Sequence, residues 1–187
     1  MASLSDILNA VYINNPTLKS FLRVIQFFAK SPNKLGIAWK DNLTWILPLE
    51  NRKLKLGVIG AGKMGSFHFE KFHSLPNCEV MGIYDIETSR ATQVALNTGV
   101  KVFEKVEELL FEADSVVVAS SSASHYPIVK QALNAGVHVL VEKPLALTSK
   151  EASELAKLAE QTQLVLQVGF VESFRMREMT KTLDFSS

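Results

Sequence analysis

The sequence predicts an α/β protein built around a doubly wound parallel sheet. Short apolar segments alternate with segments of helical periodicity through most of the chain. The first apolar segment ends in a turn with glycines at the spacing G-x-G-x-x-G, residues 60–65. The second apolar segment ends in a carboxylate, Asp85. Strands that alternate with helices in this way form a parallel sheet with right-handed crossovers, so these three observations predict the fold class.

The composition is that of a globular protein with little net charge. Of the 187 residues, 47% are hydrophobic and 21% are charged, and the net charge is +1 at pH 7. This balance gives no strong field to attract nucleic acid or anionic lipid, so neither is expected as a partner. The single cysteine, Cys78, cannot form an internal disulfide, which favours a reducing compartment and a cytoplasmic location. No apolar run approaches the ~18 residues that a transmembrane helix needs, and no signal peptide is expected.

The first 53 residues do not follow the alternation and are predicted to form a mainly helical N-terminal extension. Its clearest helix is expected over Thr17–Lys30, where apolar residues recur at helical spacing. Basic residues outnumber acidic ones in this region. The simpler interpretation is that the apolar face docks on the domain body or on a second subunit. A membrane surface or a partner protein is the alternative.

Residues 54–168 carry the alternation and are predicted to form one domain. We expect six strands, over residues 54–59, 79–84, 100–103, 115–119, 137–141 and 164–168. Five connecting helices are expected over residues 64–75, 87–97, 106–112, 126–134 and 150–161. The predicted core positions of these helices are Met64, Phe67, Phe72, Leu75, Val106, Leu109, Leu110, Leu155, Leu158 and Ala159. His68 and His73 lie five residues apart, which does not suit a helical metal-binding pair, and no metal site is predicted.

The glycine turn has the pattern of a dinucleotide-binding, Rossmann-type loop. Gly60 allows the sharp turn, Gly62 lets the backbone approach phosphates, and Gly65 lets the next helix pack against the strand. The free N–H groups of that helix and the positive end of its dipole then face the anion. The residues between the glycines complete the predicted cofactor-binding turn; they are Ala61, Lys63 and Met64.

Asp85 gives this motif its predicted cofactor preference. It follows Gly65 by 20 residues, at the end of the next strand. A carboxylate there can accept hydrogen bonds from both hydroxyls of the adenosine ribose, and it would repel a 2′-phosphate. The spacing therefore favours NAD over NADP, although Arg90 could soften the discrimination. The alternative is that Asp85 only caps the helix that starts near Glu87.

Two further strand ends are expected at the same edge of the sheet. One carries Ser120, Ser121, Ser122 and His125, where the hydroxyls could bind a ligand or cap a helix. The other carries Glu142, Lys143 and Pro144. Lys143 could donate a hydrogen bond or shuttle a proton at a substrate hydroxyl beside the nicotinamide. An exposed lysine paired with Glu142 on the surface is the alternative, and the residues alone leave both interpretations open.

Taken together, these motifs resemble the glucose-fructose oxidoreductase, inositol dehydrogenase and rhizopine-catabolism protein (MocA) family of sugar dehydrogenases. The resemblance covers about residues 54–175. Its most specific part is the block 132–146, which reads ALNAGVHVLVEKPLA. The other matching parts are the segment 57–65, the strand that ends in Asp85, the segment 116–120 with His125, and the segment 167–170.

The resemblance implies NAD(P)-dependent oxidation or reduction at a sugar carbon. Lys143 would match the family's active-site lysine, and Glu142 and Pro144 would shape its loop. The cofactor would be held by the glycine turn and Asp85, with His125 on the cofactor-side loop. The stretch 168–174 is loosely similar to a subgroup that includes nucleotide-sugar dehydrogenases.

Three departures from the family pattern change what is expected. Ser120-Ser121-Ser122 stands where the family usually has Thr-Pro-Asn, which predicts looser cofactor binding. Residues 1–53 have no counterpart in the family's usual start. The family's second α/β domain supplies the sugar pocket and an acid/base, whereas residues 169–187 predict only a stub of it. We therefore expect a truncated chain.

The first functional hypothesis is an NAD(P)-dependent oxidoreductase acting on a small-molecule sugar or nucleotide-sugar. Hydride would pass between a C–OH carbon of the substrate and the nicotinamide. The second hypothesis is a truncated, non-catalytic dinucleotide-binding protein. The third is an interaction module that uses the basic N-terminal helix. A homo-oligomer is compatible with each of these hypotheses.

Overall fold

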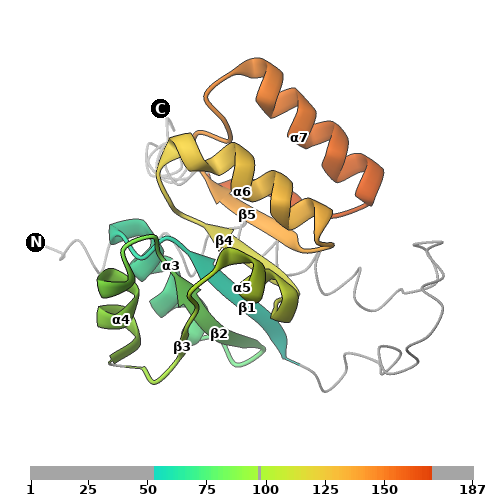
Figure 1. Ribbon diagram of the computed structural model, residues 1–187. Helices are drawn as coiled ribbons and strands as arrows, with labels where there is room; N and C mark the ends of the chain where they lie inside the picture. Colours follow the sequence, from blue (N-terminus) through green and yellow to red (C-terminus); the bar gives the residue numbers. More distant parts are fainter. Residues whose placement is uncertain (1–52, 97, 170–187) are drawn as a thin grey trace, which may run out of the picture.

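The computed structural model describes residues 53–96 and 98–169, which form a six-stranded sheet with helices on both faces (Figure 1). The strand order is β3-β2-β1-β4-β5-β6, and every neighbouring pair is parallel. The predicted doubly wound α/β fold is therefore confirmed. The helical extension predicted for residues 1–53 and the stub predicted after β6 fall almost entirely outside the described residues, so the predicted domain boundaries stay predictions.

All six predicted strands and all five connecting helices are present in the described part of the chain. The strands are β1 Leu54–Ile59, β2 Cys78–Tyr84, β3 Lys101–Val102, β4 Ser115–Val118, β5 His138–Glu142 and β6 Leu166–Gly169. The helices are α3 Lys63–His73, α4 Thr88–Leu96, α5 Val106–Glu112, α6 Ser122–Asn134 and α7 Ser149–Thr162. The bounds of α5 match the prediction.

Helix α6 begins earlier than predicted, at Ser122 instead of residue 126. The serines there form the first helical turn: the N–H and the hydroxyl of Ser124 both donate to the carbonyl of Ser121. Pro127 consequently lies inside the helix and not at its start.

One predicted core position on α3 is wrong. Met64 is 37% exposed, whereas Phe69, which was not predicted, is 1% exposed. The buried side of α3 consists of Gly65, His68, Phe69 and Phe72, a set with the i, i+3, i+4, i+7 spacing of one helical face. Phe72 belongs to both the predicted and the observed face, whereas Gly65 and His68 each lie one residue after a predicted position.

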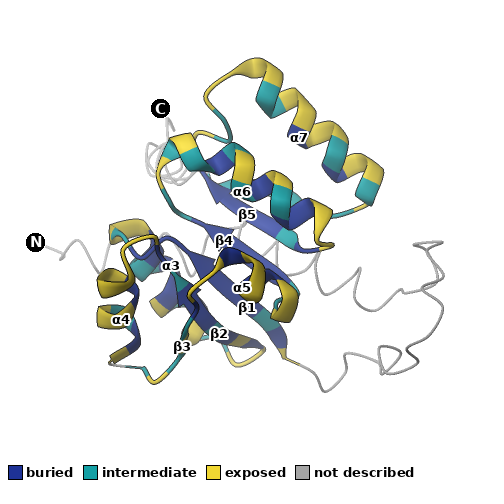
Figure 2. Cartoon of the chain, in the orientation of Figure 1, coloured by how far each residue is buried: buried dark blue, intermediate teal, exposed yellow. Residues whose placement is uncertain are grey.

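The sheet separates two apolar cores, and its strands are mostly buried (Figure 2). Helices α3 and α4 pack on one face, against residues such as Val58, Val117 and Leu140. Helices α5, α6 and α7 pack on the other, against residues such as Val118 and Val141. Side chains alternate between the two faces along each strand, as the pleat requires.

This topology gathers the loops that carry the predicted site. Ile59 at the end of β1 is paired with Tyr84 of β2 on one side and with Val118 of β4 on the other. Val118 is in turn paired with Val141 near the end of β5. The strands after β1 are added first on one side of it, as β2 and β3, and then on its other side, as β4, β5 and β6. The strand order therefore changes direction between β1 and β4. The carboxyl ends at such a switch point form the crevice where open α/β sheets bind ligands.

Two small polar side chains are buried in the strands. Cys78 is 5% exposed, and burial raises the pKa of its thiol to about 12, so it packs as an uncharged residue. The hydroxyl of Ser115 is buried and has no hydrogen-bond partner among the described residues.

None of the helices in the described part of the chain is long and apolar enough to span a membrane.

Acidification is predicted to destabilise the fold through His138. Its Nδ1 accepts a hydrogen bond from the N–H of Val165 at 3.0 Å, and burial lowers the pKa of the side chain below its usual value. The unfolded chain then binds a proton that the folded chain resists, so the free energy of unfolding falls as the pH drops below about 6.5. Urea unfolding at about pH 7.5 and about pH 5 measures this loss.

His138→Asn should lose less stability on acidification, because an asparagine oxygen can replace Nδ1 as the acceptor without titrating. His73→Asn is the matched control, since His73 is exposed. Equal losses in the parent and in His138→Asn would contradict this account.

Candidate functional site

Two positions in the glycine turn can be occupied only by glycine. Gly60 has φ +100°, and a Cβ there would lie 2.7 Å from the carbonyl carbon of Ala119. Its N–H donates to the carbonyl of Tyr84 at 2.7 Å. A Cβ on Gly65 would overlap the carbonyl oxygen of Gly60. Both glycines therefore allow β1, the turn and α3 to pack closely, as the motif predicts.

Gly62 has a different surrounding. A Cβ on Gly62 would meet no atom of the described residues within 4 Å, and the residue has φ −71° and ψ −174°, which any amino acid adopts. Gly62 is the N-cap residue of α3, and no side chain accepts a capping hydrogen bond from the first N–H groups of this helix. The first N–H groups of α3 thus open onto free space at the positive end of the helix dipole. This is the arrangement that binds a phosphate group.

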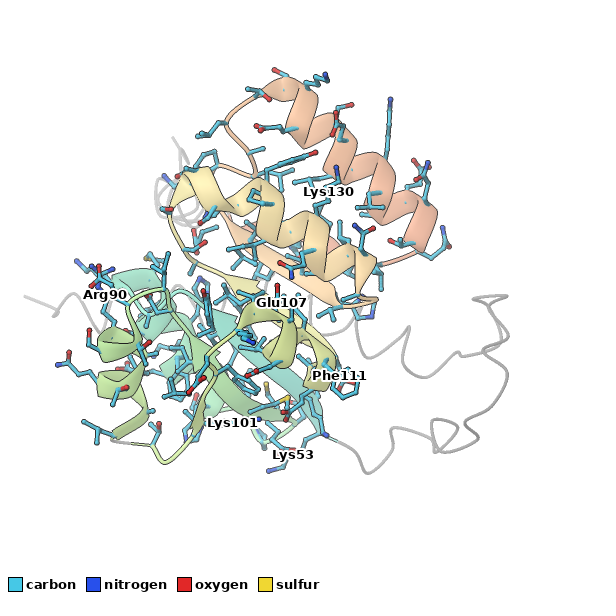
Figure 3. All side chains as sticks on the ribbon, viewed as in Figure 1. Lys53, Arg90, Lys101, Glu107, Phe111 and Lys130 are labelled. Atoms are coloured by element: carbon cyan, nitrogen blue, oxygen red, sulfur yellow. The ribbon has the colours of Figure 1, made fainter. Side chains whose placement is uncertain are left out.

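A hollow of about 470 Å³ adjoins the glycine turn, between α3 and α4. Gly62, Lys63 and Ser66 line it from α3, and Arg90 lines it from α4. Arg90 extends from α4 at the edge of the molecule in Figure 3, and its guanidinium pairs with Glu87 at 2.9 Å. Both basic side chains are exposed to solvent. The hollow therefore has a mixed polar and apolar lining, which includes Phe69 and Val94, and two basic side chains contribute to it.

Asp85 connects the glycine turn to the end of β2. The carboxylate is 8% exposed. Its Oδ2 accepts a hydrogen bond from the N–H of Ala61 at 2.6 Å, and its Oδ1 accepts one from the N–H of Glu87 at 2.8 Å. The second bond closes a turn just before α4 and does not reach an N–H of that helix, which begins at Thr88. Each carboxylate oxygen has a further lone pair, so these bonds leave acceptor capacity for a ligand.

The serine segment after β4 is hydrogen-bonded within itself. The hydroxyl of Ser124 lies 2.8 Å from that of Ser120 and 3.2 Å from that of Ser121. Ser121 is the N-cap of α6, but its side chain does not cap the helix. Ser120 and Ser122 are half-buried at the sheet edge. The hydroxyls of Ser120 and Ser121 therefore lie near each other, and the backbone nitrogen of Ser120 would lie 2.7 Å from a Cβ added to Gly60.

His125 lies beneath this segment and is 1% exposed. Its Nδ1 is 2.6 Å from the carbonyl oxygen of Pro144, and its Nε2 is 3.1 Å from that of Ser120. Both partners can only accept, so the two bonds together require a ring that carries both protons, and a neutral ring makes one at a time. The side chain binds two loops of the site to each other. Its direct contact with a cofactor stays a prediction.

Glu142 is a buried carboxylate, which differs from the surface ion pair considered as an alternative. It is 9% exposed at the end of β5, and its Oε1 lies 2.6 Å from Nε2 of His68, which is 2% exposed. A Cβ on Gly169 of β6 would lie 3.2 Å from the same oxygen, so the glycine leaves room for the carboxylate. Lys143 follows and is exposed, and the Lys143–Pro144 peptide bond is cis.

The contact between His68 and Glu142 was not predicted from the sequence. The sequence did contain a sign that His68 is buried. His68 lies three residues after Gly65 and four before Phe72, and this spacing places it on the buried face of α3. Among the described residues, no group of three or more His, Cys, Asp or Glu side chains could hold a metal ion. The predicted site residues thus occupy one sheet edge, with two buried histidines beneath them.

Comparison with known proteins agrees with the fold. Residues 54–170 match the model of an oxidoreductase family with an NAD-binding Rossmann fold. UDP-N-acetylglucosamine 3-dehydrogenase of Acidithiobacillus ferrooxidans is 34% identical over 119 residues, which are 64% of this chain and 37% of that protein. Inositol 2-dehydrogenase of Rubrobacter xylanophilus is 33% identical over 129 residues, 67% of this chain and 37% of that protein.

A solved structure shows the same fold. It is GenD2 from gentamicin A biosynthesis, in complex with NAD, with 35% identity and a TM-score of 0.61 over 63% of this chain and 34% of that one. The chain spans less than two fifths of the length of these relatives. The family model nevertheless covers most of the chain. The protein therefore belongs to the oxidoreductase family with an NAD-binding Rossmann fold that includes glucose-fructose oxidoreductase, inositol dehydrogenase and MocA.

Proposed function

We propose that the protein binds NAD at the glycine turn and acts as an oxidoreductase on a hydroxyl-bearing carbon of a sugar or nucleotide-sugar. The observation that carries the proposal is the Asp85 carboxylate, buried at the end of β2 and hydrogen-bonded to the glycine turn. It brings the predicted ribose acceptor and the predicted phosphate-binding turn within one hydrogen bond of each other.

The cofactor-binding residues have separate roles. The first N–H groups of α3 would bind the pyrophosphate, because Gly62 leaves that approach open. Asp85 would accept hydrogen bonds from the adenosine ribose, and its charge favours NAD over NADP. Ala61, Lys63 and Met64 would complete the turn, with Ser120, Ser121, Ser122 and the Glu142–Pro144 loop on the nicotinamide side.

Lys143 is the proposed catalytic residue. Bound NAD would accept the hydride from the C–OH carbon of the substrate. The exposed ammonium of Lys143 follows β5 directly at the same sheet edge. From there it would donate a hydrogen bond to the substrate oxygen and assist the transfer of its proton. The relatives named for dehydrogenation of UDP-N-acetylglucosamine and inositol support a ring hydroxyl as the reacting group.

A second candidate function is NAD binding without turnover. It is favoured by what the described residues offer, since the glycine turn and the Asp85 carboxylate account for binding of a cofactor, and the matched family model is described by its NAD-binding fold. Hydride transfer also needs a wall that holds the substrate carbon about 3–3.5 Å from the nicotinamide. The third hypothesis, an interaction module, depends on residues 1–53, which lie almost entirely outside the described residues.

The charge of Asp85 is predicted to set the cofactor preference. In calorimetric titrations the parent should bind NAD more tightly than NADP. Asp85→Asn should lose about tenfold or more in NAD affinity, because bonds to a charged acceptor contribute ~1.5–3 kcal/mol. Its preference for NAD over NADP should narrow, because the repulsion of the 2′-phosphate is removed. Asn is preferred to Ala because one oxygen acceptor is kept beside the turn.

Glu108→Gln is the matched control for this experiment. It removes an exposed carboxylate on α5, which packs on the face of the sheet opposite α3 and α4, and it should keep the parental preference. A parent that prefers NADP, or an Asp85→Asn protein with the parental preference, would refute the assignment of Asp85.

Turnover should depend on Lys143. NADH formation is measured with inositol, UDP-N-acetylglucosamine and glucose 6-phosphate, the last because a Bacillus subtilis relative is a glucose-6-phosphate 3-dehydrogenase, 36% identical over 116 residues. Lys143→Met should lower kcat by about 10²–10⁴ and leave NAD affinity within a few-fold of the parent. Lys150→Met, which changes another exposed lysine, should match the parent.

The outcomes separate the two candidate functions. Tight NAD binding with no NADH from any of the compounds favours binding without turnover. Activity that survives Lys143→Met contradicts the catalytic role of Lys143. Absence of NAD binding contradicts both candidates.

A further inference from the structure

The segment that carries Lys143 is held by two buried histidines that come from opposite faces of the sheet. His68 lies on α3, and His125 lies on α6. These helices cover different faces of the sheet (Figure 1). One histidine contacts the residue before Lys143 and the other contacts the residue after it. The exposed lysine is therefore flanked on both sides by buried polar contacts.

The contact before Lys143 follows from the alternation of β5. Leu140 belongs to the core on the α3 face, whereas Val139 and Val141 belong to the core on the other face. Glu142, two residues after Leu140, therefore points to α3, where its Oε1 lies 2.6 Å from Nε2 of His68. The ring of His68 is also stacked near Phe72, with the centroids 6.4 Å apart. A buried carboxylate in these apolar surroundings depends on its hydrogen-bond donor.

The contact after Lys143 uses the backbone. The carbonyl oxygen of Pro144 lies 2.6 Å from Nδ1 of His125, and the other ring nitrogen faces the carbonyl of Ser120. His125 thus ties the lysine loop to the serine segment after β4. His68 ties the same loop to the helix that begins at the glycine turn. Together the two contacts connect Lys143 with both other loops of the candidate cofactor site.

We propose that His68 and His125 are positioning residues, which hold the Glu142–Pro144 segment so that the ammonium of Lys143 stays at the sheet edge beside the cofactor turn. The proposal rests on the catalytic role given to Lys143 above. Neither histidine needs to touch substrate or cofactor, because both are almost fully buried. Loss of the donor at His68 would leave the Glu142 carboxylate without this partner, and the segment would relax to solvate it.

A matched pair of substitutions isolates the hydrogen bond from the packing of the ring. His68→Gln places an amide nitrogen near the position of Nε2 and keeps a donor for Glu142. His68→Asn places the nitrogen near Nδ1, one bond too short to replace it. Both variants are polar and differ by one methylene group. Glu142→Gln keeps the shape of the side chain and one oxygen acceptor but removes the charge, so it weakens the same hydrogen bond, because a bond to a charged acceptor is about twice as strong as a neutral one.

Two readouts are needed, and only one depends on turnover. Backbone ¹⁵N order parameters of Lys143, Leu145 and Ala146 report the rigidity of the loop, with Val116–Val118 of β4 as the internal reference. In His68→Asn and Glu142→Gln they should fall from about 0.85 towards 0.6, while the β4 values stay unchanged and His68→Gln stays like the parent. In an active protein, kcat should fall about tenfold in His68→Asn. KM for NAD should stay within about threefold.

The outcomes distinguish this proposal from the proposed function. A parent without turnover contradicts the catalytic role of Lys143, while the order parameters still decide whether His68 holds the loop. Parental order parameters in both His68→Asn and Glu142→Gln would overturn the proposal. Equal loss in His68→Gln and His68→Asn would overturn it as well, because the effect would then come from the ring and not from the hydrogen bond. If His68→Asn does not fold, the comparison of Glu142→Gln with the parent decides.

Discussion

The hydrogen bond between the Ala61 N–H and the Asp85 carboxylate is the contact on which the candidate site depends. It joins the turn after β1 to the end of β2 across 24 residues at 2.6 Å. The same carboxylate accepts from the Glu87 N–H, so it also orients the start of the next helical segment. A buried carboxylate of this kind fixes the turn before any ligand arrives. The N–H groups proposed to bind phosphate and the carboxylate proposed to bind the ribose are consequently preorganised relative to each other.

Buried histidines hold the other two loops of the candidate site, which follow β4 and β5. His68 and His125 have no more than 2% of their surface exposed, and both contact the segment that carries Lys143. The layer above them is open: Lys63, Arg90 and Lys143 are exposed. This division gives a rigid support and an accessible surface, which is the general requirement for holding reacting groups in a productive geometry. The parallel sheet makes it possible, because all of its carboxyl ends meet at one edge.

Local features of the sequence predicted most of the fold. Apolar runs located the six strands, and helical spacing located the five helices, because both signals lie within a few neighbouring residues. The errors have local causes too. Helix α6 begins at the serines, earlier than predicted, and the buried face of α3 includes Phe69 in place of Met64.

The site was less predictable than the fold. The glycine spacing and the distance to Asp85 are readable along the chain, so the cofactor turn could be predicted. The bond between His68 and Glu142 spans 74 residues and depends on which strands are neighbours and which face each residue takes. Neither the order of the strands nor the face on which each residue lies can be predicted from two residues alone. The burial of His125 between two carbonyl groups has the same origin, because the partners come from two different loops.

We propose that the open turn at Gly62 binds the pyrophosphate of NAD, and the Gly62→Ala variant tests this assignment. A Cβ there meets nothing within 4 Å and the backbone needs no positive φ, so the free energy of unfolding should stay at the parental value. The methyl group would nevertheless occupy the space of the phosphates, so calorimetry should show NAD affinity reduced about tenfold or more. Ser153→Ala, on the exposed side of α7, should change neither quantity. Parental NAD affinity in a folded Gly62→Ala protein would contradict the account.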